Sequence, residues 1–354
     1  MNRPVGIVSF AQRPSVRRED ALDETELVQD VVSRALAEAG VTLADVGFVC
    51  SGSCDFLIGR PFSFVAVLDA LGAWPPICES HVEMDGAFAL YEAWVRLQHG
   101  DVDVALVYGF GRSSMGDLRA VMGAQLDPYL VAPLGLDSVS LAALQARALL
   151  DAGVGDEAEW AAIAHTRRTD AARNPNAQLR QSAAVADLLR APYLVSPLRK
   201  HDCPPISDGA AALVLVAGDR ARDCNARPAW IRGLDHRADP HALGLRTLTD
   251  SPSTRLAAER AGAFAGPAPD LVEYHAPFTS QDALLRRILP IGPQTSVNPS
   301  GGALAANPMM VAGLTRIGEA ASRLSRGEGR RAIAHATSGP LLQQNLVAVL
   351  EVEP

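Results

Sequence analysis

A repeated order of helix and strand constrains this 354-residue chain more than any other feature of its sequence. Residues 34–49 and residues 255–274 each end a helix at an Ala-Gly pair and then enter an apolar strand. Residues 96–100 and 323–327 each end a helix with an Arg-Leu pair and a glycine, and each leads into a further apolar strand. Because both matches occur in the same order, the sequence predicts an α/β half that is used twice.

Hydrophobic periodicity predicts the individual elements of the first copy. A short apolar run predicts a buried strand, and apolar residues spaced by three or four predict a helix that ends near a glycine. The predicted elements are a strand at Val5–Phe10, a helix at Glu24–Ala39 closed by Gly40, a strand at Val46–Cys50, a helix at Gly86–Leu97, and a strand at Val102–Tyr108 that runs into a turn at Gly109–Gly111.

The pattern changes between the two copies to short helical pieces broken by prolines and polar turns. This change predicts an inserted loop domain at residues 112–204. The N-terminal half then consists of residues 1–111, completed by residues 205–222, and the C-terminal half consists of residues 223–354.

Two related halves packed face to face would bring equivalent helix N-termini together near a pseudo-two-fold axis. The first N–H groups of a helix have no partner within the helix, and they carry a partial positive charge. We therefore expect a site at this axis that suits an oxyanion or the enolate oxygen of a thioester.

Charge and composition disfavour several classes of function. The net charge is −8, from 32 basic and 40 acidic residues, so the chain lacks the positive field that nucleic-acid binding requires. Lys200 is the only lysine, which disfavours an imine-forming aldolase or a pyridoxal enzyme. No group of His, Cys or carboxylate residues has the spacing of a zinc site, so no metal is predicted.

The cysteines and the apolar runs predict where the protein works. The five cysteines are an odd number and include no C-x-x-C pair, which favours reduced thiols in the cytoplasm. The first residues lack the apolar core and cleavage site of a signal peptide. No apolar run approaches the roughly 18 to 20 residues of a membrane span. We therefore expect a cytoplasmic protein.

Four motifs carry a resemblance to a known superfamily. They are Gly86–Leu90 at a helix start, Asp208–Ala212 before a strand, His275–Phe278 after a strand, and the glycine turn within Asn298–Leu304. In their order and spacing the chain resembles the thiolase superfamily, in particular the sterol-carrier-protein type of thiolase and the thiolase-like lipid-transfer proteins of actinobacterial steroid breakdown. The resemblance covers nearly the whole chain and implies a five-layer αβαβα core that acts on acyl-CoA thioesters.

The resemblance also implies partners. Family members are dimers, so we expect a homodimer or a heterodimer with a thiolase paralogue. The steroid side-chain aldolases of the superfamily work with a small partner protein that has an OB-fold and a zinc ribbon, and we expect a partner of this kind. No cofactor is expected beyond the CoA thioester that serves as substrate.

The chain departs from the family where the family carries out its chemistry. A thiolase has its nucleophilic cysteine three residues before the helix-opening glycine, but this chain has Glu83 there. Asn307 replaces the histidine of the family's Gly-His-Pro segment, and no second cysteine lies between His335 and Pro340. A mixed anhydride on Glu83 would be far more labile than a thioester, which disfavours acyl transfer.

Four residues are candidates for catalysis. His275 matches the family histidine that helps to hold the thioester oxygen, and its imidazole can stabilise a developing enolate. Glu83 and Asp85 are expected to act as general acid or base if they are buried at the centre; in the alternative they only cap the following helix. His335, at the end of a predicted strand, either transfers a proton or is a buried, hydrogen-bonded histidine.

Five further residues are expected to bind the substrate, because the resemblance places their segments beside the thioester. They are Gly301, Gly302, Asn307, Ser338 and Gly339. Cys54 is an alternative nucleophile on the loop after the second predicted strand. Gly109–Gly111 does not predict a dinucleotide site, because Ser114 lies where the third glycine of that motif would fall.

Three functions are consistent with these features. The first is retro-aldol cleavage, or the reverse bond formation, next to the CoA thioester of a bulky or steroid-like acyl group, without a cysteine acyl-enzyme. The second is thiolase or Claisen acyl transfer of the acetyl-CoA acyltransferase type, with an unusual nucleophile. The third is a non-catalytic subunit that serves as a scaffold for a partner.

Overall fold

Strands from the whole length of the chain form one large mixed sheet. The computed structural model describes residues 3–72, 74 and 76–353, and these include a sheet of ten strands. In spatial order the strands are β3 (Glu79–Val82), β2 (Phe48–Gly52), β4 (Val104–Arg112), β7 (Asp208–Ala217), β1 (Val5–Gln12), β8 (Ala229–Ala238), β12 (Gln344–Glu351), β11 (Arg331–Ser338), β9 (Leu271–Tyr274) and β10 (Ser296–Val297).

The strand order is palindromic about the centre of the sheet. In the N-terminal half β1 is antiparallel to β7, β7 is antiparallel to β4, and β4 is parallel to β2. In the C-terminal half β8, β12, β11 and β9 repeat these directions in the same order. The duplication predicted from the sequence is thereby confirmed.

The two half-sheets meet through a short antiparallel contact between β1 and β8. The register joins Gly6 to Trp230 and Ile7 to Ala229. Each half-sheet then continues away from this contact, with the central helices α4 (Gly86–His99) and α12 (Ala312–Ser325) packed between the two halves. The halves are therefore connected along one seam as well as packed face to face.

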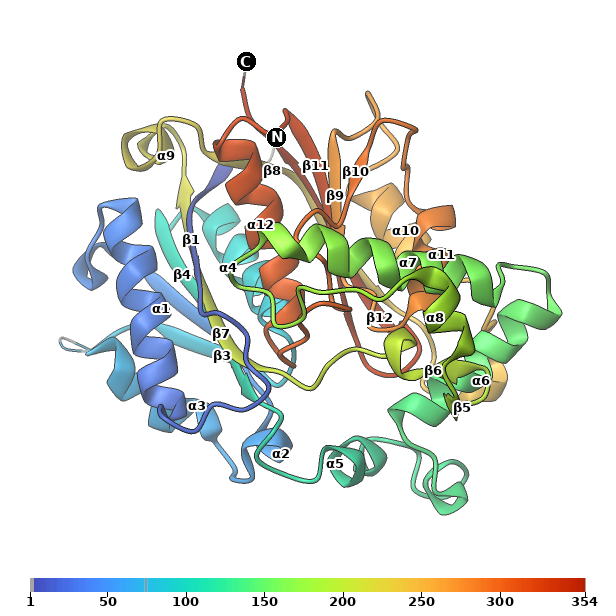
Figure 1. Ribbon diagram of the computed structural model, residues 1–354. Coiled ribbons are helices and arrows are strands. Elements are labelled where there is room, and N and C mark those ends of the chain that lie inside the picture. Colours follow the sequence, from blue (N-terminus) through green and yellow to red (C-terminus); the bar gives the residue numbers. More distant parts are fainter. Residues whose placement is uncertain (1–2, 73, 75, 354) are drawn as a thin grey trace.

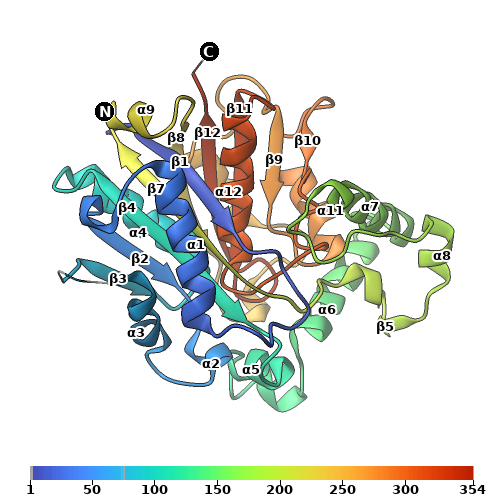
Figure 2. The same ribbon diagram turned by 60° about the vertical axis from the view of Figure 1, so that its left-hand side comes forward.

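Three hydrophobic clusters define five layers. One cluster joins α4 and α12 to the inner faces of both half-sheets. A second packs α1 (Glu24–Ala39) on the outer face of the N-terminal half, and a third packs α10 (Pro252–Arg260) and α11 (Thr279–Ile288) on the outer face of the C-terminal half. Figure 1 and Figure 2 show α1 on one side, α12 in the middle and α11 on the other side. The predicted αβαβα layering is confirmed.

The ends of α1 follow from local sequence. Asp23 accepts a hydrogen bond from the backbone N–H of Glu26, and the Glu26 side chain accepts one from the backbone N–H of Asp23. Gly40 ends the helix with φ of 65°, a conformation that glycine adopts without strain. The predicted bounds of this helix are those of the structure.

The segment between the halves is mostly helical. It contains α5 (Leu118–Ala124), α6 (Ser138–Asp151), α7 (Glu157–Asp170), α8 (Val185–Arg190), and a small sheet of β5 (Tyr193–Val195) and β6 (Leu198–Arg199). Both α6 and α7 pack against α11, as Figure 1 shows for α7. Short helices elsewhere are α2 (Asp55–Ile58), α3 (Ser63–Val67) and α9 (Arg220–Cys224).

The predicted turn at Gly109–Gly111 is wrong, because β4 continues through these residues to Arg112. The glycines have a packing reason. A Cβ atom on Gly111 would lie 2.0 Å from the carbonyl oxygen of Met309, and one on Gly109 would lie 2.7 Å from that of Met310. The end of β4 therefore runs close against the loop before α12. None of the helices among the described residues is both long and apolar enough to cross a membrane.

Candidate active site

A cavity of about 700 Å³ lies where strands of both halves end. Its lining includes Cys54 after β2, Glu83 after β3 and Ser113 after β4. From the C-terminal half it includes His275, directly after β9, and Ser338 at the end of β11. Ligands of α/β proteins commonly bind beyond the carboxyl ends of strands, so this cavity is the candidate site.

Asp85 joins the N-termini of the two central helices. Its carboxylate accepts hydrogen bonds of 2.9 Å from the backbone N–H groups of Ala87 in α4 and of Gly313 and Leu314 in α12. The side chain is buried, and Gly313 leaves room for it, since a Cβ atom there would lie 2.6 Å from Oδ1. The helix N-termini do meet, as the duplication predicts, but the anion that they hold is Asp85.

His275, in the lining of the cavity, is held by hydrogen bonds from its side chain and from its backbone. Its Nε2 lies 2.9 Å from Oδ1 of Asn307, and its backbone N–H donates to the carbonyl oxygen of His335. Among the described residues, Nδ1 has no hydrogen-bond partner. Burial lowers the pKa of the His275 imidazole below its ordinary value, although Asp85 and Asn307 act in the opposite direction. The imidazole is therefore neutral near pH 7.

The tautomer of His275 depends on the orientation of the Asn307 amide. When Oδ1 of Asn307 accepts the hydrogen bond, the proton lies on Nε2 and Nδ1 carries a lone pair. The same amide then keeps its two Nδ2 donors for another group. This pair can accept a proton at Nδ1 and donate a hydrogen bond from Nδ2, which are the two functions that enolate chemistry needs.

Glu83 lies at the rim of the cavity rather than at a buried centre. Its side chain is 45% exposed, Oε1 accepts a hydrogen bond of 2.6 Å from the backbone N–H of Asp55, and Oε2 is 3.5 Å from Nε2 of His81. The burial on which its predicted acid–base role depended is not found, because the loop after β3 leaves this side chain in contact with solvent.

His335 lies inside β11, not at its end, and is not part of the cavity lining. Its side chain is fully buried, and Nε2 is 3.0 Å from Oδ1 of Asn345 on β12. Burial lowers the pKa of His335 to about 3. This geometry matches the alternative of a buried, hydrogen-bonded histidine.

The predicted substrate-binding residues separate into two groups. Asn307, Ser338 and Gly339 line the cavity. Gly301 and Gly302 do not, and both have a positive φ in a tightly packed turn. A Cβ atom on Gly301 would lie 2.5 Å from the Cβ of Ala171 in the insertion. The glycine turn therefore serves close packing between the C-terminal half and the inserted segment.

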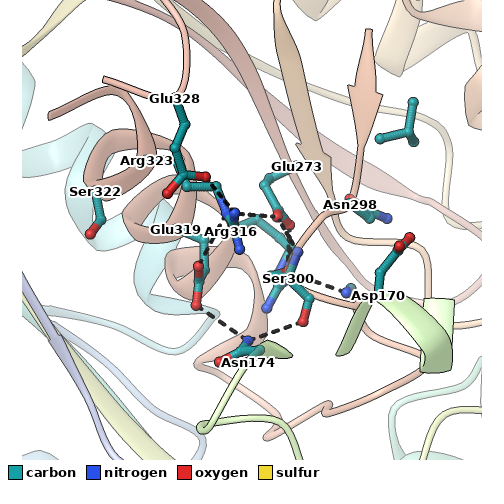
Figure 3. Close-up of polar contacts among 12 residues, drawn as sticks. Asp170, Asn174, Glu273, Asn298, Ser300, Arg316, Glu319, Ser322, Arg323 and Glu328 are labelled. Atoms are coloured by element: carbon teal, nitrogen blue, oxygen red, sulfur yellow. Dashed lines mark hydrogen bonds and ion pairs between the residues drawn. The ribbon is translucent and has the colours of Figure 1, made fainter. Parts of the chain in front are cut away.

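A buried network of charges supports the strand that carries His275. Glu273 on β9 pairs with Arg316 on α12 at 2.8 Å and accepts hydrogen bonds from the backbone N–H and the hydroxyl of Ser300. Asn174 of the insertion donates to the carbonyl oxygen of Ser300, and Figure 3 shows it between Ser300 and Glu319. Burial, and then Glu273, raises the pKa of Glu319. The network fixes β9, α12 and the insertion relative to one another.

Two cysteines line the cavity, but neither is a thiolate. Burial is the main cause that raises the pKa of Cys54 to about 11; Glu83 acts in the same direction, and hydrogen bonds to the backbone of Leu57 and Phe56 act in the opposite direction. Burial raises the pKa of Cys203 to about 12. The thiolate is the nucleophilic form of cysteine, so both residues are unreactive at neutral pH. No cluster of three or more potential metal ligands occurs within the described part of the chain.

Some residues of the cavity were missed by sequence reasoning. Ser113 and Gln281 line it, and the Oγ and Oε1 atoms of these side chains have no hydrogen-bond partner among the residues that the structure describes. Gln281 lies six residues after His275 in the first turn of α11. Its proximity to His275 in sequence is the only signal that could have found it.

Comparisons with known proteins agree with this architecture. No family model matches the chain. The chain is 26% identical over 343 residues to an acetyl-CoA acetyltransferase of Methanothermobacter thermautotrophicus, with 89% of each chain covered. It is 27% identical over 223 residues to a steroid side-chain-cleaving aldolase of Thermomonospora curvata, with 59% of this chain and 56% of that protein covered.

The solved structure of an Ltp2-ChsH2(DUF35) aldolase has the same fold. The TM-score is 0.79, with 21% identity, over 99% of this chain and 98% of that one. The likeness extends from the first strand to the last and includes both halves and the insertion. The chain thus resembles the thiolase superfamily in sequence and in fold, and these similarities agree with the resemblance to its thiolase-like lipid-transfer type that the motifs indicate.

Proposed function

We propose that the protein cleaves a carbon–carbon bond next to a CoA thioester by a retro-aldol reaction, or forms it in reverse, without a cysteine acyl-enzyme. The observation that carries this proposal is the pairing of a neutral His275 with Asn307 in a cavity whose two cysteines are protonated thiols. Similarity to a protein named as a steroid side-chain-cleaving aldolase supports it.

The reaction needs a base and a donor, and it consumes no other reactant. A base takes the proton of the β-hydroxyl group, the Cα–Cβ bond breaks, and Cβ becomes a ketone or aldehyde carbon. The electron pair of the broken bond moves to the thioester as an enolate. Protonation of Cα by the conjugate acid then gives the shortened acyl-CoA, so one proton is taken and one is returned.

His275 and Asn307 take these two roles in the proposal. Nδ1 of His275 accepts the hydroxyl proton and later returns it, and the negative charge of Asp85 favours the intermediate imidazolium. The Nδ2 group of Asn307 donates to the enolate oxygen, an effect worth roughly 3 kcal/mol per donor. Asp85 positions both central helices around this pair and is a positioning residue rather than the base.

The cavity suits a bulky apolar acyl group. Its volume is about 700 Å³, and many of its lining residues are apolar. The apolar side chains of the lining include Met84, Leu118, Met122, Val139, Phe278 and Met309. We therefore propose a steroid-like or similarly bulky acyl-CoA as the substrate class.

A partner protein belongs to the proposal as well. The name of the aldolase with the similar structure combines Ltp2 with ChsH2(DUF35), which supports a partner protein for this chain. A small partner with an OB-fold and a zinc ribbon is proposed from the family resemblance. A dimer with a second copy or with a thiolase paralogue is proposed from the family resemblance. Activity should therefore be measured for the chain alone and in the presence of a DUF35 protein.

The test is incubation with bulky β-hydroxyacyl-CoA thioesters, followed by mass spectrometry of small products and of the intact protein. Release of a ketone or aldehyde with the shortened acyl-CoA, and no acyl adduct on the protein, is the expected result. A stable adduct on Cys54 or Glu83 would instead support acyl transfer. Acyl-CoA binding without any product, with the partner present, would leave the scaffold function.

A further inference from the structure

Gln281, in the lining of the cavity, has a buried acceptor whose orientation is fixed by a chain of amides. Nε2 of Gln145 donates to the carbonyl oxygen of Leu248 at 3.2 Å, and Nε2 of Gln281 donates to Oε1 of Gln145 at 3.0 Å. Gln281 lines the cavity, whereas Gln145 of α6 does not. Both side chains are buried, at 1% and 2% exposure.

The order of this chain leaves no freedom to exchange nitrogen and oxygen. A backbone carbonyl only accepts hydrogen bonds, so Gln145 must turn its nitrogen toward Leu248 and its oxygen toward Gln281. Gln281 must then present its own nitrogen to Gln145. The atom left over is therefore Oε1 of Gln281, an acceptor, and it has no partner within the described residues.

We propose that Gln281 is a specificity-determining residue that accepts a hydrogen bond from a donor of the bound thioester. The donor is an O–H of the acyl chain or an N–H of the pantetheine arm, and the identity of the ligand as an acyl-CoA rests on the proposed function. The nearby lining of Val139, Ala142 and Phe278 is apolar, so one buried acceptor there discriminates strongly between ligands that satisfy it and ligands that do not.

Packing alone does not account for the pair. Two apolar side chains would join α6 to α11 without leaving an unsatisfied acceptor, since replacing both partners of a buried hydrogen bond by apolar groups is close to neutral. The relay also draws on three separate segments of the chain, α6, α11 and the loop at Leu248, to fix a single amide. This arrangement is expected if the direction of the Gln281 amide matters for ligand binding.

The experiment measures dissociation constants of decanoyl-CoA and of a series of hydroxydecanoyl-CoA isomers, with the wild type and with Gln281→Met. If the acyl chain supplies the donor, one isomer binds the wild type at least about tenfold more tightly than decanoyl-CoA, and Gln281→Met removes that preference. If the pantetheine arm supplies it, Gln281→Met weakens the whole series by a similar factor. Both results support the assignment and separate the two sources of the donor.

Two further variants separate recognition from structure. Gln145→Met frees the amide of Gln281 to rotate and should reduce the effect only in part. Gln178→Met is the matched control, because its Oε1 also lacks a partner among the described residues but the side chain is outside the cavity lining. It should leave all dissociation constants unchanged.

If Gln281→Met changes the dissociation constant of every probe by less than about threefold, the inference is overturned. If the variant also has a lowered melting temperature, the Gln145–Gln281 pair serves stability alone. Binding does not depend on turnover. A Gln281-dependent preference without carbonyl release would remove only the retro-aldol proposal, whereas carbonyl release with unchanged binding would remove only this one.

Discussion

The two halves have the same strand order, but they supply the cavity with different chemistry. In the N-terminal half the loop after β3 leaves Glu83 exposed at the rim. In the C-terminal half His275 follows β9, and the buried ion pair between Glu273 of β9 and Arg316 of α12 fixes this strand (Figure 3). The strand ends of both halves thus bring side chains to one cavity, and the polar network behind a side chain determines whether that side chain is fixed well enough for proton transfer.

The largest expected effect is on turnover, in the C-terminal half. His275→Gln should lower kcat by about 10²- to 10⁴-fold, the usual contribution of a general base. His99→Gln, an exposed histidine at the end of α4, is the control and should not change kcat. Since the pKa of His275 is lowered, wild-type kcat should be constant down to about pH 6.5 and fall only at more acidic pH. Full turnover by His275→Gln would contradict the assignment.

The next effect is on stability and tests the network itself. Arg316→Met removes the nearer partner of the buried Glu273 and leaves only Arg323 at 4.0 Å, so the free energy of unfolding should fall by about 3 kcal/mol. Arg326→Met removes an exposed pair with Glu328 at the end of the same helix and should cost less than about 1 kcal/mol. Chemical denaturation measures both, and equal losses would show that the buried network is not special.

A third prediction concerns acid sensitivity. His335 is neutral when folded, with a pKa of about 3, while the unfolded chain takes up a proton below about pH 6.5. Stability is therefore lost as the pH falls from 6.5 toward 3. Between pH 7 and pH 5 the free energy of unfolding of the wild type should fall by about 2 kcal/mol more than that of His335→Gln. Parallel pH profiles for the two proteins would rule out this linkage.

The smallest effect is expected in the N-terminal half. Glu83→Gln should change kcat by no more than about threefold, because the side chain is half exposed and its Oε1 only accepts a backbone hydrogen bond from Asp55. A loss of a hundredfold in steady-state assays would restore the acid–base role that the sequence predicted for this residue, and the contrast between the halves would disappear.

The sequence predicted the elements that depend on local signals. The helix from Glu24 to Gly40 has its capping residues and its terminal glycine within its own segment, so its bounds are correct. Gly109–Gly111 was mistaken for a turn, because glycine signals both turns and close backbone approach. The second cause requires Met309, two hundred residues away.

Residues of the site could be predicted only where a sequence motif specified both the residue type and its position in the fold. His275 and Asn307 come from separate motifs and meet in the cavity. The sequence predicts correctly that Glu83 lies beside the cavity, but its predicted burial is wrong, since burial depends on the loops around the side chain. The Gln281–Gln145–Leu248 relay has no local signature at all, because each of its two hydrogen bonds joins residues more than a hundred positions apart.

Asp85 has a consequence for how the molecule folds and how it can change. Its carboxylate caps the N-terminus of one helix from each half, so neither half expressed alone could complete this cap. The N-terminal half would keep the carboxylate without most of its donors. The C-terminal half would keep its donors without an anion. The two halves should therefore unfold as one cooperative unit. Glu83, two residues from Asp85, makes none of these hydrogen bonds, so a substitution there should leave the joint between the halves intact.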